Sequence, residues 1–174
     1  MSAIDTFLDH NARSLASFSN GQLPVEPRER IAVVTCMDAR LVTGAFLGLK
    51  EGDAHVIRNA GGVVTEDVIR SLIISQRLLG TREIMLIHHT DCGMLTFDDG
   101  ELREAIRKET GIRPSFAMEA FSDLDEEVRQ SIARICTSPF VVHKDAVRGF
   151  VYEVETGRLR EVETSPDDTP EALA

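Results

Sequence analysis

Short apolar runs that alternate with helical segments restrict the fold of this chain more than any other feature. Residues 31–35 (IAVVT), 54–59 (AHVIRN) and 83–89 (EIMLIHH) are rich in Val, Ile and Leu, which is typical of strands in a buried sheet. Between the last two runs, residues 65–80 (TEDVIRSLIISQRLLG) predict a helix with a Thr cap, two acids in its first turn and a Gly at its end. Strands alternating with helices predict right-handed crossovers, and therefore an α/β fold with a mostly parallel central sheet flanked by helices.

The remaining segments complete this pattern. Apolar residues at helical spacing predict an amphipathic helix over residues 4–18, and charge-rich helices are expected over 98–111 and 122–138. Residues 148–163 predict a hairpin that turns at Thr156 and Gly157. We expect one α/β domain over residues 1–164, in which residues 1–28 form an N-terminal helical arm and its connector. Residues 165–174 are expected to form a flexible acidic tail.

Composition excludes several classes of partner. The formal net charge is −10, which argues against nucleic acid, because phosphate binding relies on clustered Lys and Arg. No apolar run approaches the roughly 20 residues that a membrane span needs. The first residues mix acids with apolar side chains, unlike a secretory signal or a transit peptide. We therefore expect a cytoplasmic protein that binds neither nucleic acid nor membrane.

Three cysteines, at positions 36, 92 and 136, raise the question of their role. An odd number of cysteines is not a disulfide framework, and in a reducing compartment cysteines serve as ligands, nucleophiles or core residues. Taken alone, Cys36 is an ordinary core cysteine, and Cys136, late in a predicted helix, is a core residue or a free thiol. The interpretation of Cys36 and Cys92 changes once their neighbours are considered.

Cys36 and the segment from His89 to Cys92 each follow a predicted strand. In parallel sheets the functional groups gather beyond the carboxyl ends of the strands, so neighbouring strands would bring these side chains to one edge. His89 and Cys92 form a His-x-x-Cys motif, a spacing that lets one turn wrap two ligands around an ion. Two thiolates and one imidazole suit zinc, and three protein ligands leave a fourth position open. We therefore predict a metal site made by Cys36, His89 and Cys92.

Asp38 and Arg40 follow Cys36 at alternate positions and admit two arrangements. Asp38 could act as a fourth ligand and close the site. Alternatively, Arg40 could hold Asp38 away from the metal through a bidentate ion pair, so that the carboxylate orients a reacting water. Asp91, between the two ligands of the His-x-x-Cys motif, is either a partner of the site or a turn residue. The sequence leaves both questions open.

The Cys-x-Asp-x-Arg motif, followed about fifty residues later by His-x-x-Cys, resembles the β-class carbonic anhydrases, in particular their compact, short-chain members. The resemblance extends through VIRNAGG (56–62) and HTDCGM (89–94), and covers roughly residues 30 to 155. It implies four parallel strands and an antiparallel fifth, one Zn²⁺ per chain held by the predicted ligands, and Asp38 and Arg40 as a catalytic dyad. It also implies a homodimer or higher oligomer, often formed by exchange of N-terminal helices.

The activity implied by the resemblance is the reversible hydration of carbon dioxide to bicarbonate and a proton, by attack of a metal-bound hydroxide. Asn59 and Gly62, near the end of the second strand, are expected to bind substrate. The regulatory bicarbonate pocket of some members uses a Trp, and this chain has none. Two other functions remain possible: a carbonyl sulfide or carbon disulfide hydrolase with the same zinc centre, and a non-catalytic, zinc-stabilised oligomer.

Overall fold

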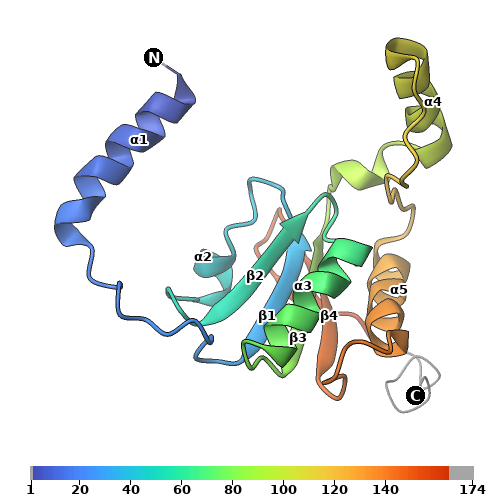
Figure 1. Cartoon of the computed structure of the whole chain (residues 1–174). Coiled ribbons are helices and arrows are strands. Elements are labelled where there is room, and N and C mark those ends of the chain that lie inside the picture. The colour runs from blue at the N-terminus through green and yellow to red at the C-terminus, as the bar shows by residue number, and fades with distance from the viewer. Residues whose placement is uncertain (1, 165–174) are drawn as a thin grey trace.

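The computed structural model describes residues 2–164, and the strands expected from the apolar runs form one five-stranded sheet (Figure 1). β1 (Ile31–Cys36), β2 (Ala54–Asn59), β3 (Glu83–His89) and β4 (Val147–Tyr152) are parallel, and β5 (Leu159–Glu161) is antiparallel to β4. The strand order is β2-β1-β3-β4-β5. This confirms the predicted α/β fold with four parallel strands and an antiparallel fifth.

The register of the sheet brings the ends of β1, β2 and β3 together. Cys36, the last residue of β1, pairs with Asn59 on β2, and Thr35 pairs with Ile87 on β3. β1 is buried from Ala32 to Cys36, and it pairs with β2 on one edge and β3 on the other. Loops that follow β1 and β3 therefore leave the sheet side by side.

Two helices lie over one face of the sheet and enclose the main core. Figure 1 shows α3 (Glu66–Arg77) and α5 (Leu124–Thr137) beside the sheet. Their apolar side chains pack against alternate residues of β1 and β3. The Thr65 hydroxyl accepts a hydrogen bond from the Val68 amide, so the predicted cap of α3 is present. Core residues of this layer are fully or almost fully buried and include Val34, Val68, Leu72, Leu86, Ile132 and Ile135.

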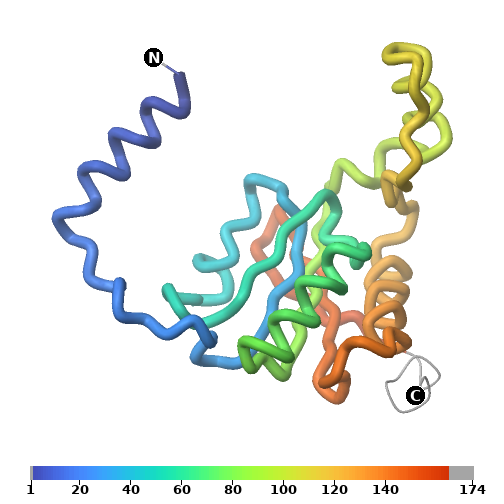
Figure 2. Tube along the Cα trace, viewed as in Figure 1, coloured from blue at the N-terminus to red at the C-terminus, as the bar shows by residue number. Residues whose placement is uncertain are grey.

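Two segments project from this body, as the trace in Figure 2 shows. The predicted N-terminal helix is present as α1 (Ala3–Ser14), followed by the short helix η1 (Leu15–Ser17). At the other side, η2 (Gly93–Leu95) leads from β3 to α4 (Asp99–Thr110), which stands away from the sheet. Neither α1 nor α4 contains a buried residue.

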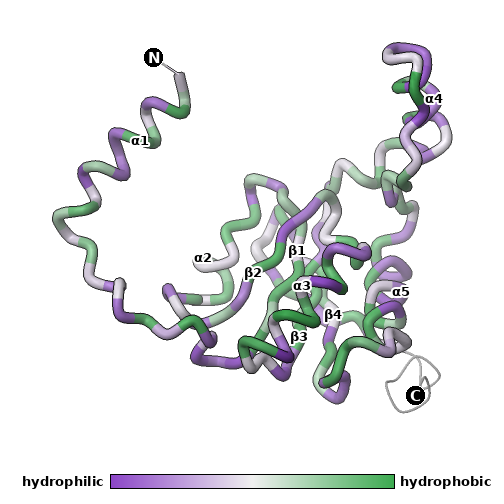
Figure 3. The backbone as a smooth tube through the Cα atoms, in the orientation of Figure 1, coloured by the Kyte–Doolittle hydropathy of each residue, from purple (hydrophilic) through white to green (hydrophobic). Residues whose placement is uncertain are grey.

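Exposed apolar side chains distinguish α1 from the helices that cover the sheet. A capping box between Ser2 and Asp5 begins the helix, so its local sequence explains why it is helical. Its apolar positions nevertheless face outward, with Ile4 and Phe7 each 70% exposed. The hydropathy colouring in Figure 3 shows apolar and polar residues alternating along this isolated helix. We refer to residues 2–28 as the arm.

The C-terminal part of the described chain is a hairpin, as predicted. Gly157 has a positive φ of 75° and its amide donates to the Glu153 carbonyl at 2.8 Å, which closes the turn between β4 and β5. The expected tail over residues 165–174 lies outside the described residues. Among residues 2–164, no helix is long and apolar enough to cross a bilayer. The last short helix, α2 (Thr43–Leu47), follows the loop after β1.

Candidate metal centre

The predicted ligands meet at the carboxyl edge of the sheet. Cys36 ends β1, His89 ends β3, and Cys92 lies in the turn that follows. Their ligand atoms all lie within 4.8 Å of one another, and all three side chains are buried. The expectation that neighbouring strands would gather these side chains is confirmed.

His89 presents a free lone pair to this cluster. Its Nδ1 donates a hydrogen bond to the Thr90 carbonyl at 2.8 Å, because a carbonyl can only accept. This assigns the proton to Nδ1 and leaves Nε2 as the acceptor nitrogen. Nε2 is buried and has no hydrogen-bond partner among the described residues. An acceptor nitrogen buried beside two sulfur atoms fits a soft divalent cation.

The two thiols share one hydrogen bond. Hydrogen bonding from the Cys92 thiol lowers the pKa of Cys36 and raises the pKa of Cys92. Cys36 is therefore the thiol that ionises more readily, while the second proton is held between the sulfur atoms. A bound cation would replace that proton, because thiolate ligands release protons when they bind a metal. The donor set thus fits Zn²⁺, whose charge two thiolates would balance.

Asp38 and Arg40 form an ion pair beside the cluster. Arg40 Nε lies 3.0 Å from Asp38 Oδ1, Arg40 Nη2 lies 2.8 Å from Asp38 Oδ2, and the Arg40 amide also donates to Oδ1. These bonds hold the pKa of the Asp38 carboxyl well below its usual range. Asp38 Oδ2 is 3.9 Å from His89 Nε2. Of the two arrangements that the sequence left open, this structure has Asp38 paired with Arg40.

Asp91 is both a turn residue and a partner of the site. Its φ of 53° lies in the left-handed region, which Asp tolerates better than most residues. Its carboxylate accepts from Arg40 Nη1 at 2.7 Å, and its carbonyl accepts from Arg40 Nη2 at 2.9 Å. Arg40 therefore joins the loop after β1 to the loop after β3.

Asn59 and Gly62 lie next to the cluster, with different constraints. The Asn59 Nδ2 group donates to the Val63 carbonyl at 2.8 Å, and its buried Oδ1 has no partner among residues 2–164. Gly62 has a φ of 74°, and a Cβ there would lie 2.8 Å from the Cys36 amide nitrogen. A side chain at position 62 would therefore displace the backbone that carries the first ligand.

Arg58 contributes to the site, although the sequence pattern did not single it out. Its Nε donates to the Cys36 carbonyl at 3.0 Å and its Nη2 to the Asp38 carbonyl at 2.7 Å. The side chain thus fixes the backbone on both sides of Met37. The position of Arg58 near the end of β2, next to the end of β1, could have identified it as a residue of the site.

Apolar side chains surround the ligands. Leu41 and Met94 are buried with the two cysteines, and Phe46 stacks on Tyr152 with ring centroids 4.4 Å apart. The adjacent His88 is fully buried against the edge of Phe121, and burial lowers its pKa to about 4. His88 is therefore neutral at physiological pH. These surroundings suit a small, uncharged substrate.

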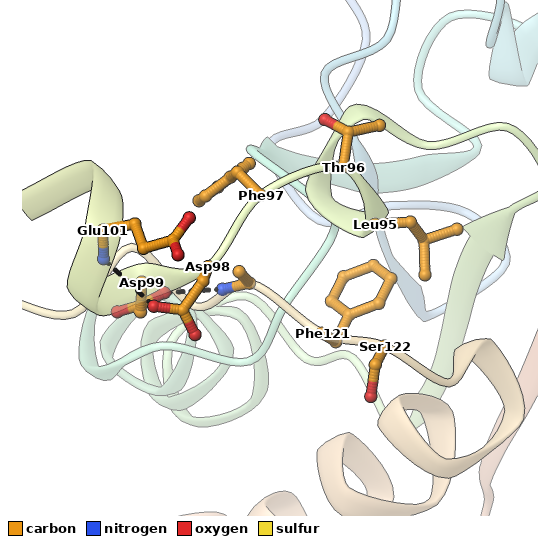
Figure 4. A pocket seen from close by; sticks show the side chains of 9 residues that line it. Leu95, Thr96, Phe97, Asp98, Asp99, Glu101, Phe121 and Ser122 are labelled. Carbon is orange, nitrogen blue, oxygen red and sulfur yellow. Dashed lines mark hydrogen bonds between the residues drawn. The ribbon is translucent and has the colours of Figure 1, made fainter.

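A cavity of about 520 Å³ opens between η2 and the start of α4, as Figure 4 shows. Two of its acids have structural roles: Asp98 accepts from the Glu101 amide, and Asp99 accepts from the amides of Met118 and Ala120. Phe121 belongs both to this cavity and to the apolar surroundings of the ligands. The cavity is therefore a neighbour of the metal centre and does not contain the ligand residues.

Comparison with known proteins agrees with this chemistry. The family described as "Carbonic anhydrase" matches residues 31–159. A β-carbonic anhydrase 1 of Mycobacterium bovis is 57% identical over 162 residues, which cover 93% of this chain and 99% of that protein. A carbon disulfide hydrolase of Acidithiobacillus thiooxidans is 33% identical over 80% of each chain. A crystal structure of a carbonic anhydrase from Streptococcus mutans, 44% identical, superposes with a TM-score of 0.88 and covers 94% of this chain and 99% of that one.

Proposed function

The chain belongs to the β-carbonic anhydrase family, and from this premise we propose that it catalyses the reversible hydration of carbon dioxide to bicarbonate and a proton. One observation carries the proposal: a buried Cys36, His89 and Cys92 cluster lies next to an ionised Asp38 held by Arg40. The cluster offers ligands for a metal, and the carboxylate offers a hydrogen-bond acceptor beside it.

We propose that the cluster holds one Zn²⁺ per chain through the two thiolates and His89 Nε2. Bound zinc supplies Lewis acidity and makes a water molecule acidic enough to ionise near neutral pH. Support for this ligand set comes from the unpartnered Nε2 and from the lowered pKa of Cys36. Asp38 is a possible fourth ligand in a closed state, since a carboxylate oxygen already lies 3.9 Å from Nε2.

Asp38 and Arg40 act as the catalytic dyad in this proposal. Asp38 accepts a hydrogen bond from the reacting water and so orients its lone pair towards carbon dioxide. Arg40 keeps Asp38 ionised and fixes its direction through the bidentate pair. Arg58 supports the backbone of this loop through the carbonyls of Cys36 and Asp38.

Substrate binding is assigned to Gly62, Asn59 and the apolar wall. Carbon dioxide has no charge, and the apolar groups of Leu41, Met94 and Phe46 exclude competing water. The Asn59 Oδ1, which lacks a partner among the described residues, offers one polar contact. Because Gly62 approaches Cys36 so closely, its backbone can border the reacting atoms where a larger residue could not.

The exposed arm supports self-association as a homodimer or higher oligomer. We propose that the arm packs on a second copy, because the apolar side chains of α1 are otherwise left in water. We further propose that residues 1–164 are one domain with residues 1–28 as its arm and connector, and that the protein is cytoplasmic. Three free cysteines suit a reducing compartment, in which two of them can serve as ligands.

The deciding experiment is stopped-flow carbon dioxide hydration from pH 6 to 9, with zinc content measured on the same sample. We expect one zinc per chain and a rate that rises with pH, because two thiolates donate more charge to zinc than imidazoles do. A rate equal to buffer in zinc-replete protein would instead support a non-catalytic, zinc-stabilised oligomer.

Rates measured with carbon dioxide, carbonyl sulfide and carbon disulfide distinguish a carbonic anhydrase from a carbonyl sulfide or carbon disulfide hydrolase. The 57% identity to a protein named β-carbonic anhydrase, against 33% to one named carbon disulfide hydrolase, favours carbon dioxide. A higher kcat/KM for either sulfur compound would overturn that choice while leaving the metal site in place.

A further inference from the structure

Asp91 occupies an unusual position for an acidic residue. It lies between His89 and Cys92 in the chain and adopts a φ of 53°, whereas most side chains avoid the left-handed region. Its side chain is 70% exposed, so burial does not hold it there. The contacts that it makes all lead to Arg40 rather than to the ligand atoms.

Arg40 is held from two directions. Two of its side-chain N–H groups point to Asp38 and two point to Asp91, through the Asp91 carboxylate and the Asp91 carbonyl. A guanidinium has five such donors, so these four bonds nearly exhaust it. The left-handed turn makes the second pair possible, because it directs the carbonyl and the side chain of Asp91 towards the same guanidinium.

The position of Asp38 depends on this arrangement. Asp38 Oδ2 is only 3.9 Å from His89 Nε2, so a small movement would bring the carboxylate among the ligand atoms. Arg40 opposes that movement through its bidentate pair with Asp38, but an arginine on a flexible stem could follow the carboxylate. Anchoring the far side of the guanidinium to the loop after β3 removes this freedom.

We propose that Asp91 is a positioning residue that anchors Arg40 and thereby keeps the Asp38 carboxylate out of the coordination position next to His89. This proposal deepens the proposed function and rests on it. Within residues 2–164, the hydrogen bonds of Asp91 go to Arg40 and none goes to a ligand atom, so Asp91 acts through Arg40.

The test uses Asp91→Asn in the full-length protein, loaded with zinc for kinetics and with Co²⁺ for spectroscopy. Asn keeps the size and tolerates the left-handed turn, but it lacks the charge that binds Arg40. We expect unchanged metal content, a three- to tenfold lower kcat/KM, and a similar loss of azide affinity measured from the Co²⁺ absorption bands. Azide binds the open metal position, so a carboxylate that moves there competes with it. This readout does not depend on turnover.

Three companion variants make the outcome specific. Asp91→Gly removes the carboxylate and also relaxes the backbone, so it should match Asp91→Asn if the charge is what matters. In an Asp38→Asn background, Asp91→Asn should no longer change azide affinity, because the competing carboxylate is gone. Glu104→Gln removes a carboxylate from another arginine pair, on α4 with Arg107, and should leave kcat/KM and azide affinity at wild-type values.

Three results would overturn the proposal. They are wild-type azide affinity in Asp91→Asn, loss of metal from that variant, and an effect that persists at full size in the Asp38→Asn background. Failure of the proposed function would look different: the wild-type protein would not hydrate carbon dioxide, while azide binding would still report on Asp91.

Discussion

The body of the protein, which is the sheet with α3 and α5, and the arm differ in how they bury apolar side chains. In the body, α3, α5 and the inner strands bury apolar side chains within the same chain, and Val34, Leu72 and Ile135 have no exposed surface. In the arm, α1 is correctly capped and amphipathic, yet none of its residues is buried. The difference teaches that capping and amphipathic spacing specify where a helix begins and which face is apolar, whereas a helix this short needs packing against a partner to be stable, and the single chain gives α1 no such partner.

This contrast predicts separate consequences for mutations in the two regions, and the largest belongs to the metal centre. Cys92→Ala removes one ligand, so we expect loss of bound zinc and a decrease in kcat/KM of more than about 100-fold, beyond the 10–100-fold that supporting residues usually cost. Carbon dioxide hydration and metal analysis measure the two effects. Self-association should persist, since the arm is untouched; a fully active, zinc-free variant would contradict the ligand assignment.

A change in the arm should weaken self-association and leave bound zinc in place. Phe7→Asp combined with Leu15→Asp places charge on two side chains that are 70% and 64% exposed in the single chain. If they are buried against a second copy, dissociation should become easier by at least about 100-fold, because unpaired charge is costly in an interface. Sedimentation velocity measures the shift, and the control is Asn11→Asp, which adds one negative charge to α1 without removing an apolar side chain. An unchanged oligomer would show that the arm is not the interface.

Stability of the body can be tested without touching either site. Gly149 lies on β4 under α5, and a Cβ there would overlap Val128 Cγ1. Gly149→Ala should lower the free energy of unfolding by about 1–3 kcal/mol, the usual cost of overpacking a core. Urea denaturation measures it, with Gly44→Ala as the control because its added Cβ meets only an ordinary 3.4 Å contact. Equal stability of the two variants would mean that α5 can shift away from β4 at little cost in free energy.

The smallest effect concerns one half-buried acid of the body. Burial raises the pKa of Glu127 on α5, so the folded state holds its proton more tightly than the unfolded chain does. The stability that this contributes is present at low pH and is lost as pH rises through the folded pKa. Glu127→Gln should therefore raise the melting temperature above that pKa and change it little near pH 4. The exposed Glu109→Gln is the control, and a gain at pH 4 as large as at pH 8 would refute the assignment.

The sequence predicts the body better than the surroundings of the site. Runs such as residues 83–89 identify strands because Val, Ile and Leu combine with turn signals, and the rule for strand ends then brings Cys36 and His89 together. The left-handed turn of Asp91 and the reach of Arg58 depend on side-chain directions that no spacing rule contains. The exposure of α1 could not be predicted either. An amphipathic pattern identifies an apolar helix face, but it does not show whether that face packs on the same chain or on another one.

The distance along the chain between the ligands has a consequence for how the protein assembles. Cys36 and His89 come together only after β1 and β3 have paired, and β2 and α3 lie in the intervening loop. Closing such a loop is entropically costly and must precede tight metal binding. The proposed zinc would therefore bind a sheet that has already formed, and would stabilise the folded state rather than start folding. Metal supply should accordingly govern how slowly the protein unfolds more than how quickly it folds.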